Sequence, residues 1–167
     1  MTIAEFDQMP VTEKKRLLSG CCGSDVWVKK MLAVFPVQNL VDLLEFAEEE
    51  WYECNPADWL ESFQNHIKIG DKKTLQVNFE NGDEWAFYEQ SGVFNCSAEL
   101  LDELEKANEL YEENFGYPFI ISATGKTGQE MLDNILERID NDPHDELIIA
   151  AAEQNKITQI RLKKLFA

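Results

Sequence analysis

The sequence predicts an all-α fold, a single-domain bundle of about eight to ten helices over residues 1–167. Apolar residues recur three and four positions apart through most of the chain, which is the period of an amphipathic helix. Several of these runs begin at a residue suited to capping a helix and stop at glycine or proline. Only residues 74–79 alternate in the manner of a strand, and no second strand stands out as their partner.

In the first half of the chain, short helices are expected over residues 11–18, 24–34 and 56–65. A longer amphipathic helix is expected between the last two of these. Its apolar positions are Val37, Leu40, Val41, Leu44, Ala47 and Trp51. Because residues 74–79 lack a strand partner, a helix or an extended loop is favoured there.

In the second half, Ser97 is the expected N-cap of a helix that runs through Tyr111, and Thr127 and Glu130 form a capping box at the start of the next. Pro143 suits the first turn of a last helix of about six turns. The apolar positions of these three helices are Leu100, Leu101, Leu104, Ala107 and Leu110, then Met131, Leu132, Ile135, Leu136 and Ile139, then Leu147, Ile148, Ala151, Ile157, Ile160 and Leu165.

The segment that follows Tyr111 is the most informative stretch of the chain. The helix is expected to stop at Gly116 and Pro118, and the residues that come next, 119–121, are wholly apolar. Charged residues make up 28% of this chain, so an uncharged segment at a helix end is expected to be buried or to line a pocket.

Charge and composition exclude several classes of function. The formal net charge of −17 argues against a nucleic-acid partner and against anionic membranes, because no basic stripe exists to neutralise phosphates. No apolar run approaches the ~18 residues of a membrane span, and the N-terminus lacks the features of a signal peptide. Four cysteines without a CxxC pair, together with two histidines, predict no zinc site and suggest reduced thiols in a cytoplasmic protein.

His66 is the first candidate catalytic residue. By helical spacing it shares a face with Trp59 and Phe63, which would place the imidazole at the C-terminal end of a helix, just before Gly70. A helix C-terminus favours the protonated imidazole and burial opposes it, a combination that suits proton transfer near neutral pH. The alternative is a histidine that caps the helix or fills the core.

Glu89 is the second candidate, because helical spacing puts it on one face with Trp85, Ala86 and Val93. A carboxylate on an aromatic face is costly to bury unless it is paired or used in function. The alternative is a partly exposed glutamate.

Arg161 is the third candidate. No acid lies three or four residues from it within the last helix, and its face carries Ile157, Thr158 and Leu165. Its planar guanidinium group suits binding of an anion in a pocket. The alternative is a tertiary salt bridge.

A histidine, a glutamate and an arginine would together make a cofactor-free site for an anionic substrate. The other functional patterns are weaker. His144 is expected at the surface in the first turn of the last helix, and the Cys21–Cys22 pair is interpreted as local packing. Lys126 lacks the preceding glycine that a phosphate-binding loop requires.

A set of motifs extends along nearly the whole chain. The segments are Leu17–Trp27, Asp58–Asp71, Glu89-Gln90, Asn108-x-x-Tyr111-x-x-x-Phe115-Gly116-Tyr117-Pro118-Phe119-Ile120, Arg138-x-x-Asn141, Glu146 and Lys156-Ile157-x-x-x-Arg161-Leu162. In order and spacing these segments resemble the OHCU decarboxylase family, named for 2-oxo-4-hydroxy-4-carboxy-5-ureidoimidazoline (OHCU), an intermediate of urate breakdown in purine catabolism. The combination is far more specific than any one segment.

The resemblance implies that His66 is the catalytic histidine, Glu89 the active-site glutamate and Arg161 the substrate-binding arginine. It further implies a bundle of helices, a homodimer, no metal and no organic cofactor, and it favours helix over strand at residues 74–79. The residues that it places against the substrate are Ile67, Ala86, Gln90, Phe119, Ile120 and Ile121.

The sequence departs from the family pattern at two positions. Ile67 stands where the family usually has proline, and Ala86 stands where many members have serine. Because proline restricts the backbone of the residue before it, its absence would leave His66 freer to reorient. The missing hydroxyl removes one hydrogen bond to substrate, a loss on the order of 1 kcal/mol.

The activity implied by the resemblance is that of a carboxy-lyase that forms (S)-allantoin. The electrons of the breaking C–C bond move into the neighbouring C=N group of the substrate, so no cofactor is needed, and protonation on one face sets the stereochemistry. Two alternatives remain open. One is a cofactor-free lyase that acts on a related ureido or hydroxy acid, and the other is a non-catalytic helical binding module that keeps the fold.

Overall fold

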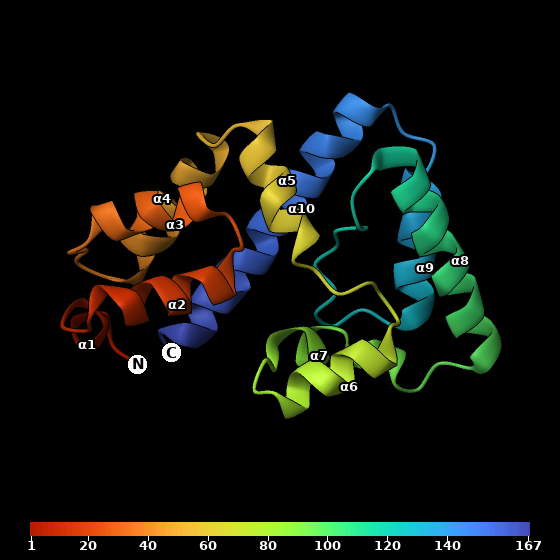
Figure 1. Cartoon of the computed structure of the whole chain (residues 1–167), viewed down its shortest axis with the longest axis horizontal. Coiled ribbons are helices and arrows are strands. Elements are labelled where there is room, and N and C mark those ends of the chain that lie inside the picture. The colour runs from red at the N-terminus through yellow and green to blue at the C-terminus, as the bar shows by residue number, and fades with distance from the viewer. The chain divides into compact units, whose positions relative to one another are not determined.

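The computed structural model describes residues 1–167 and confirms the all-α fold, with ten α-helices, one short 3-10 helix and no strand. Figure 1 shows the helices in chain order. They are α1 (Ile3–Asp7), α2 (Val11–Cys21), α3 (Asp25–Val34), α4 (Leu40–Tyr52), α5 (Pro56–Gln64), α6 (Lys72–Glu80), α7 (Trp85–Glu89), η1 (Ser91–Val93), α8 (Ala98–Phe115), α9 (Gly128–Arg138) and α10 (Pro143–Leu165).

The chain forms two compact units. The first comprises Met1–Asn65 together with Gln154–Ala167, and the second comprises His66–Glu153. The long helix α10 therefore contributes its N-terminal half to the second unit and its C-terminal half to the first. None of the helices is both long enough and apolar enough to cross a bilayer.

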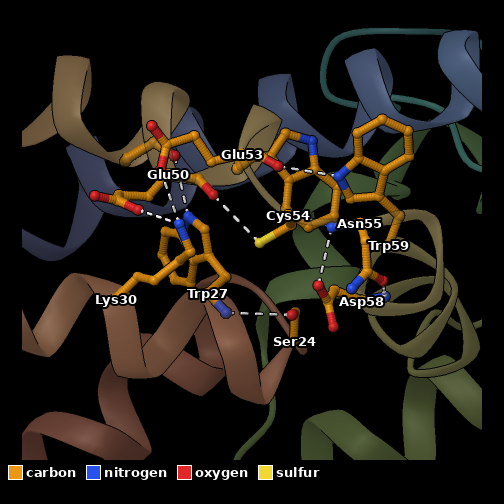
Figure 2. A network of polar contacts seen from close by, with 11 residues as sticks. Ser24, Trp27, Lys30, Glu50, Glu53, Cys54, Asn55, Asp58 and Trp59 are labelled. Carbon is orange, nitrogen blue, oxygen red and sulfur yellow. Dashed lines mark hydrogen bonds and ion pairs between the residues drawn. The ribbon is translucent and has the colours of Figure 1, made fainter.

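In the first unit, α3 packs against α2 and α4 around fully buried aromatic side chains. The indole Nε1 of Trp27 on α3 donates a hydrogen bond of 3.0 Å to the carbonyl of Ala47 on α4. Trp59 on α5 donates in the same way to the carbonyl of Trp51 at 3.0 Å. Each indole thus satisfies its single polar atom, in the core at Trp27 and at a partly buried position at Trp59 (Figure 2).

The polar groups around these rings connect α3, α4 and α5 (Figure 2). Lys30 forms ion pairs of 2.6 Å with Glu50 and 3.0 Å with Glu53. The thiol of Cys54 donates to the Glu50 carbonyl at 3.2 Å, and burial raises the pKa of that thiol to about 11. Asn55 then starts α5 with a capping box, in which its side chain accepts the backbone N–H of Asp58. All four cysteines are free.

In the second unit, α8 and α9 lie side by side (Figure 1). Ser97 caps α8 and Thr127 forms a capping box with Glu130 at the start of α9, which confirms both expectations. The helix α8 ends at Gly116, where φ is +81°, a value that favours glycine. The predicted stop before the apolar segment is therefore confirmed.

Residues 74–79 are helical and form most of α6. The side chain of Asp71 accepts the backbone N–H of Thr74 and so starts the helix. Leu75 is the buried residue of α6, whereas Val77, on the strand-like face, is largely exposed. The apparent alternation arose because some apolar residues of this short helix face the solvent.

Candidate active site

His66 lies just outside a helix, because α5 ends at Gln64 and Asn65 forms its C-cap. The N–H of Asn65 bonds to the Ser62 carbonyl at 3.3 Å, three residues back, which tightens the last turn before the chain leaves the helix. His66 thus follows the C-terminal end of α5, as expected, but it lies one residue beyond the C-cap and is not itself helical. His66 is instead the first residue of the second unit and begins a loop of residues 66–70, here named the His66 loop.

Two buried amide side chains hold the backbone of the His66 loop. Gln90 donates from Nε2 to the Ile67 carbonyl at 3.1 Å, and its Oε1 accepts the Gly70 N–H at 3.0 Å. Asn108 on α8 donates from Nδ2 to the Ile69 carbonyl at 2.9 Å. Gly70 closes the loop with a φ of +86°, a conformation that favours glycine.

Glu89 is the last residue of α7 and is only 7% exposed. The alternative of a partly exposed glutamate is therefore wrong. The expected common face with Val93 is also wrong, because α7 ends at Glu89 and Val93 lies in the following 3-10 turn. The Gln90 N–H bonds to the Ala86 carbonyl at 2.9 Å, so Gln90 forms the C-cap of the same helix. Ala86, Glu89 and Gln90, three residues that the family resemblance places at the site, thus lie on one short segment.

The segment of Phe119, Ile120 and Ile121 is buried, as expected for uncharged residues at this place. The Phe119 ring packs against Tyr111, with ring centroids 5.0 Å apart, and the Arg138 guanidinium lies 4.4 Å from its centroid. The Ile120 carbonyl accepts a hydrogen bond of 2.8 Å from Arg138 Nη1. That carbonyl is therefore occupied by a side chain of the same unit.

A buried ion pair supports this segment. Glu146 at the start of α10 is 0% exposed, and its Oε1 accepts from Arg138 Nε at 2.8 Å and from the Tyr111 hydroxyl at 2.6 Å. Its Oε2 accepts from Asn141 at 2.9 Å. Burial, and then the bond to Glu146, raise the pKa of Tyr111, which keeps the phenol protonated and donating.

Sequence reasoning assigned no role to Arg138 and Glu146, although both belong to the segments that resemble the family. The helical period of the sequence could have identified Arg138 as a buried charge, because Arg138 follows Met131 and Ile135 on the apolar face of α9. An arginine on such a face needs a buried acceptor. The identity of that acceptor depends on the path of the chain between α9 and α10.

Arg161 lies in the first unit, where its Nη1 donates to the Gly20 carbonyl at 3.0 Å. The second unit contains His66, Glu89 and the segment of residues 119–121. The constellation of His66, Glu89 and Arg161 stays a prediction. His144 is exposed in the first turn of α10, which confirms its surface position.

The model of the OHCU decarboxylase family matches residues 7–163. The chain belongs to the OHCU decarboxylase family. One curated relative of this OHCU decarboxylase family member is the uric acid degradation bifunctional protein TTL of Arabidopsis thaliana. The two sequences are 38% identical over a region that covers 88% of this chain and 45% of that protein. The uric acid degradation bifunctional protein of Bacillus sp. (strain TB-90) is 24% identical over 99% of the chain, which covers 32% of it. The chain thus spans less than half the length of these relatives.

Two solved structures share the fold of this OHCU decarboxylase family member. A crystal structure of OHCU decarboxylase in the presence of (S)-allantoin is 38% identical, with a TM-score of 0.75 over 89% of this chain and 95% of that one. A crystal structure of (S)-allantoin synthase is 16% identical, with a TM-score of 0.73 over 98% of this chain and 54% of that one. The second likeness shows the fold alone.

The replacement Ile67→Pro, which restores the usual family residue, is expected to raise the free energy of unfolding by about 0.4–1 kcal/mol. The Ile67 N–H makes no hydrogen bond in the structure, so proline removes no donor in use and restricts the unfolded chain. Urea denaturation measures the effect, with Ile67→Val as the control that keeps the N–H. A fall in stability would show that the backbone at residue 67 does not suit proline.

Proposed function

We propose that this chain catalyses the cofactor-independent decarboxylation of OHCU to (S)-allantoin. The observation that carries the proposal is family membership, which extends over residues 7–163, together with histidine and glutamate at the matched positions 66 and 89. The names of the relatives support it, since one is a uric acid degradation protein and one crystal structure of an OHCU decarboxylase was determined in the presence of (S)-allantoin.

In the proposed reaction, the C–C bond to the carboxylate breaks and releases CO2, and its electron pair moves into the adjacent C=N group. His66 acts as the acid/base and delivers a proton to one face of the electron-rich intermediate. Glu89 orients the imidazole or binds the hydroxyl and ureido N–H groups of the substrate. Arg161 holds an anionic or carbonyl oxygen of the substrate.

The substrate is proposed to lie against the segment of residues 119–121 and against Ile67 and Ala86. Apolar side chains at these positions would exclude water, which strengthens each polar interaction with the substrate. The proposed assembly is a homodimer of one OHCU decarboxylase-like domain, residues 1–167, in the cytoplasm. The match of the family model along most of the chain supports one functional domain.

The proposal is tested by generating OHCU in place from urate with urate oxidase and hydroxyisourate hydrolase. Circular dichroism then follows the product with and without this protein. We expect rapid appearance of the (S)-allantoin signal in proportion to the amount of protein added. Slow formation of racemic allantoin at the uncatalysed rate would overturn the proposal.

A second candidate function is favoured by Ile67 and Ala86, which replace the usual proline and serine of the family. Both lie where the resemblance places the substrate, so they suit a cofactor-free lyase for a related ureido or hydroxy acid. A ratio of kcat/KM that favours such an acid over OHCU would support this function. The double replacement of Ile67 by proline and Ala86 by serine should then shift the ratio toward OHCU.

A further inference from the structure

The side chain of Gln90 bonds to the His66 loop through both ends of its amide. It is 4% exposed, and both ends of its amide already bond to the His66 loop, at the Ile67 carbonyl and the Gly70 N–H. These two bonds span the loop on either side of its middle residues. An amide that donates and accepts at once fits this pair of backbone groups, whereas a carboxylate cannot donate to the carbonyl.

Gln90 also follows Glu89 directly in the chain, at the C-cap of α7. Its two bonds therefore connect the backbone that carries His66 to the helix end that carries Glu89. A second buried amide acts on the same loop from α8, because Asn108, 3% exposed, donates to the Ile69 carbonyl at 2.9 Å. Three polar groups of the loop backbone, at Ile67, Ile69 and Gly70, are thus bonded to two side chains that are far apart from the loop in sequence.

We infer that Gln90, supported by Asn108, is a positioning residue that holds the His66 loop in register with the end of α7. The inference rests on the proposed function, in which His66 transfers the proton. A shift of about 1 Å in a reacting group costs on the order of 10²-fold in rate, so the loop must be held firmly. Because residue 67 is isoleucine here and not proline, the loop depends on these bonds for its rigidity.

The first experiment compares Gln90→Met with the wild-type protein by steady-state kinetics on OHCU. Methionine keeps the length and volume of the side chain and removes both bonds. We expect kcat to fall about 10- to 100-fold with KM changed by less than about 2-fold, because positioning acts on the chemical step and not on ground-state binding. A raised KM with unchanged kcat would overturn the inference and assign Gln90 to substrate binding.

The second measurement does not depend on activity. Hydrogen exchange of the Gly70 amide, followed by NMR, is expected to become at least about 10-fold faster in Gln90→Met, because the amide loses its acceptor. In Gln90→Glu, which keeps an acceptor for Gly70 but cannot donate to Ile67, the Gly70 amide should stay protected while kcat still falls. Unchanged Gly70 exchange in Gln90→Met would overturn the inference even if the wild-type protein proved inactive on OHCU.

Rescue separates positioning from a merely structural role. Adding Ile67→Pro to Gln90→Met restricts the backbone at His66 by another route, so kcat is expected to recover by about 3-fold or more. The matched control is Gln129→Glu, an exposed glutamine on α9, which should change neither kcat nor Gly70 exchange. Absence of turnover in the wild-type protein would reject only the proposed function. Turnover in the wild-type protein, together with no rescue of Gln90→Met and no change in its Gly70 exchange, would reject only the positioning role.

Discussion

His66→Ala is expected to lower kcat for OHCU by about 10²–10⁴-fold, the usual contribution of a positioned acid or base. The imidazole is the side chain proposed to deliver the proton to one face of the intermediate. Without it, solvent supplies the proton from either side. The residual product is therefore expected to be racemic, which circular dichroism of the coupled urate assay measures together with the rate.

The matched control for this prediction is His144→Ala. His144 is the other histidine of the chain and is exposed in the first turn of α10, so its removal should leave rate and stereochemistry unchanged. The far-ultraviolet spectra of both variants should match the wild-type protein, because His66 lies in a loop outside the helices. Full activity with stereospecific product in His66→Ala would remove His66 from the mechanism.

Glu146→Ala is expected to lower the free energy of unfolding by about 3–5 kcal/mol, the cost of leaving a buried charge without its partner. Glu146 accepts hydrogen bonds from Arg138, Tyr111 and Asn141 and is fully buried. Alanine leaves the Arg138 guanidinium without its carboxylate inside the second unit. Urea denaturation followed by circular dichroism measures the loss.

The control for this prediction is Glu112→Ala, which breaks the ion pair between Lys68 and Glu112. The two side chains of that pair are 46% and 37% exposed, so its loss should cost only about 0.2–1 kcal/mol. Adding Arg138→Met to Glu146→Ala should recover part of the lost stability, because it removes the uncompensated charge. Equal costs for Glu146→Ala and Glu112→Ala would contradict the assignment of Arg138 and Glu146 as a buried pair.

The same variant should also affect activity. Arg138 bonds to the Ile120 carbonyl at 2.8 Å and packs on the Phe119 ring, so it connects the ion pair to the segment proposed to line the substrate site. Without Glu146, Arg138 loses the groups that orient it. We expect KM for OHCU to rise in Glu146→Ala at temperatures where the variant is still folded.

The helices could be predicted well from the sequence because their signals are local. The capping box of Thr127 and Glu130, the cap at Ser97 and the stop at Gly116 each depend on residues within one or two turns of one another. The helix expected over residues 56–65 ends within one residue of α5, which stops at Gln64. The end of α7 is not predicted by the sequence, because the helical spacing continues past Glu89 to Val93 and only the hydrogen bonds of the last turn show where this helix stops.

The sequence by itself determined the all-α fold, because helical period and capping are local signals. It also determined the family, through the order and spacing of the motifs, and with it the candidate site residues His66, Glu89 and Arg161. Only the tertiary structure decided that Gln90 bonds across 23 positions to Ile67, that Asn108 bonds across 39 positions to Ile69, and that Glu146 is the buried partner of Arg138. Hydrogen bonds and ion pairs of this kind depend on distances in space, and those distances exist only after the chain between the partners has folded.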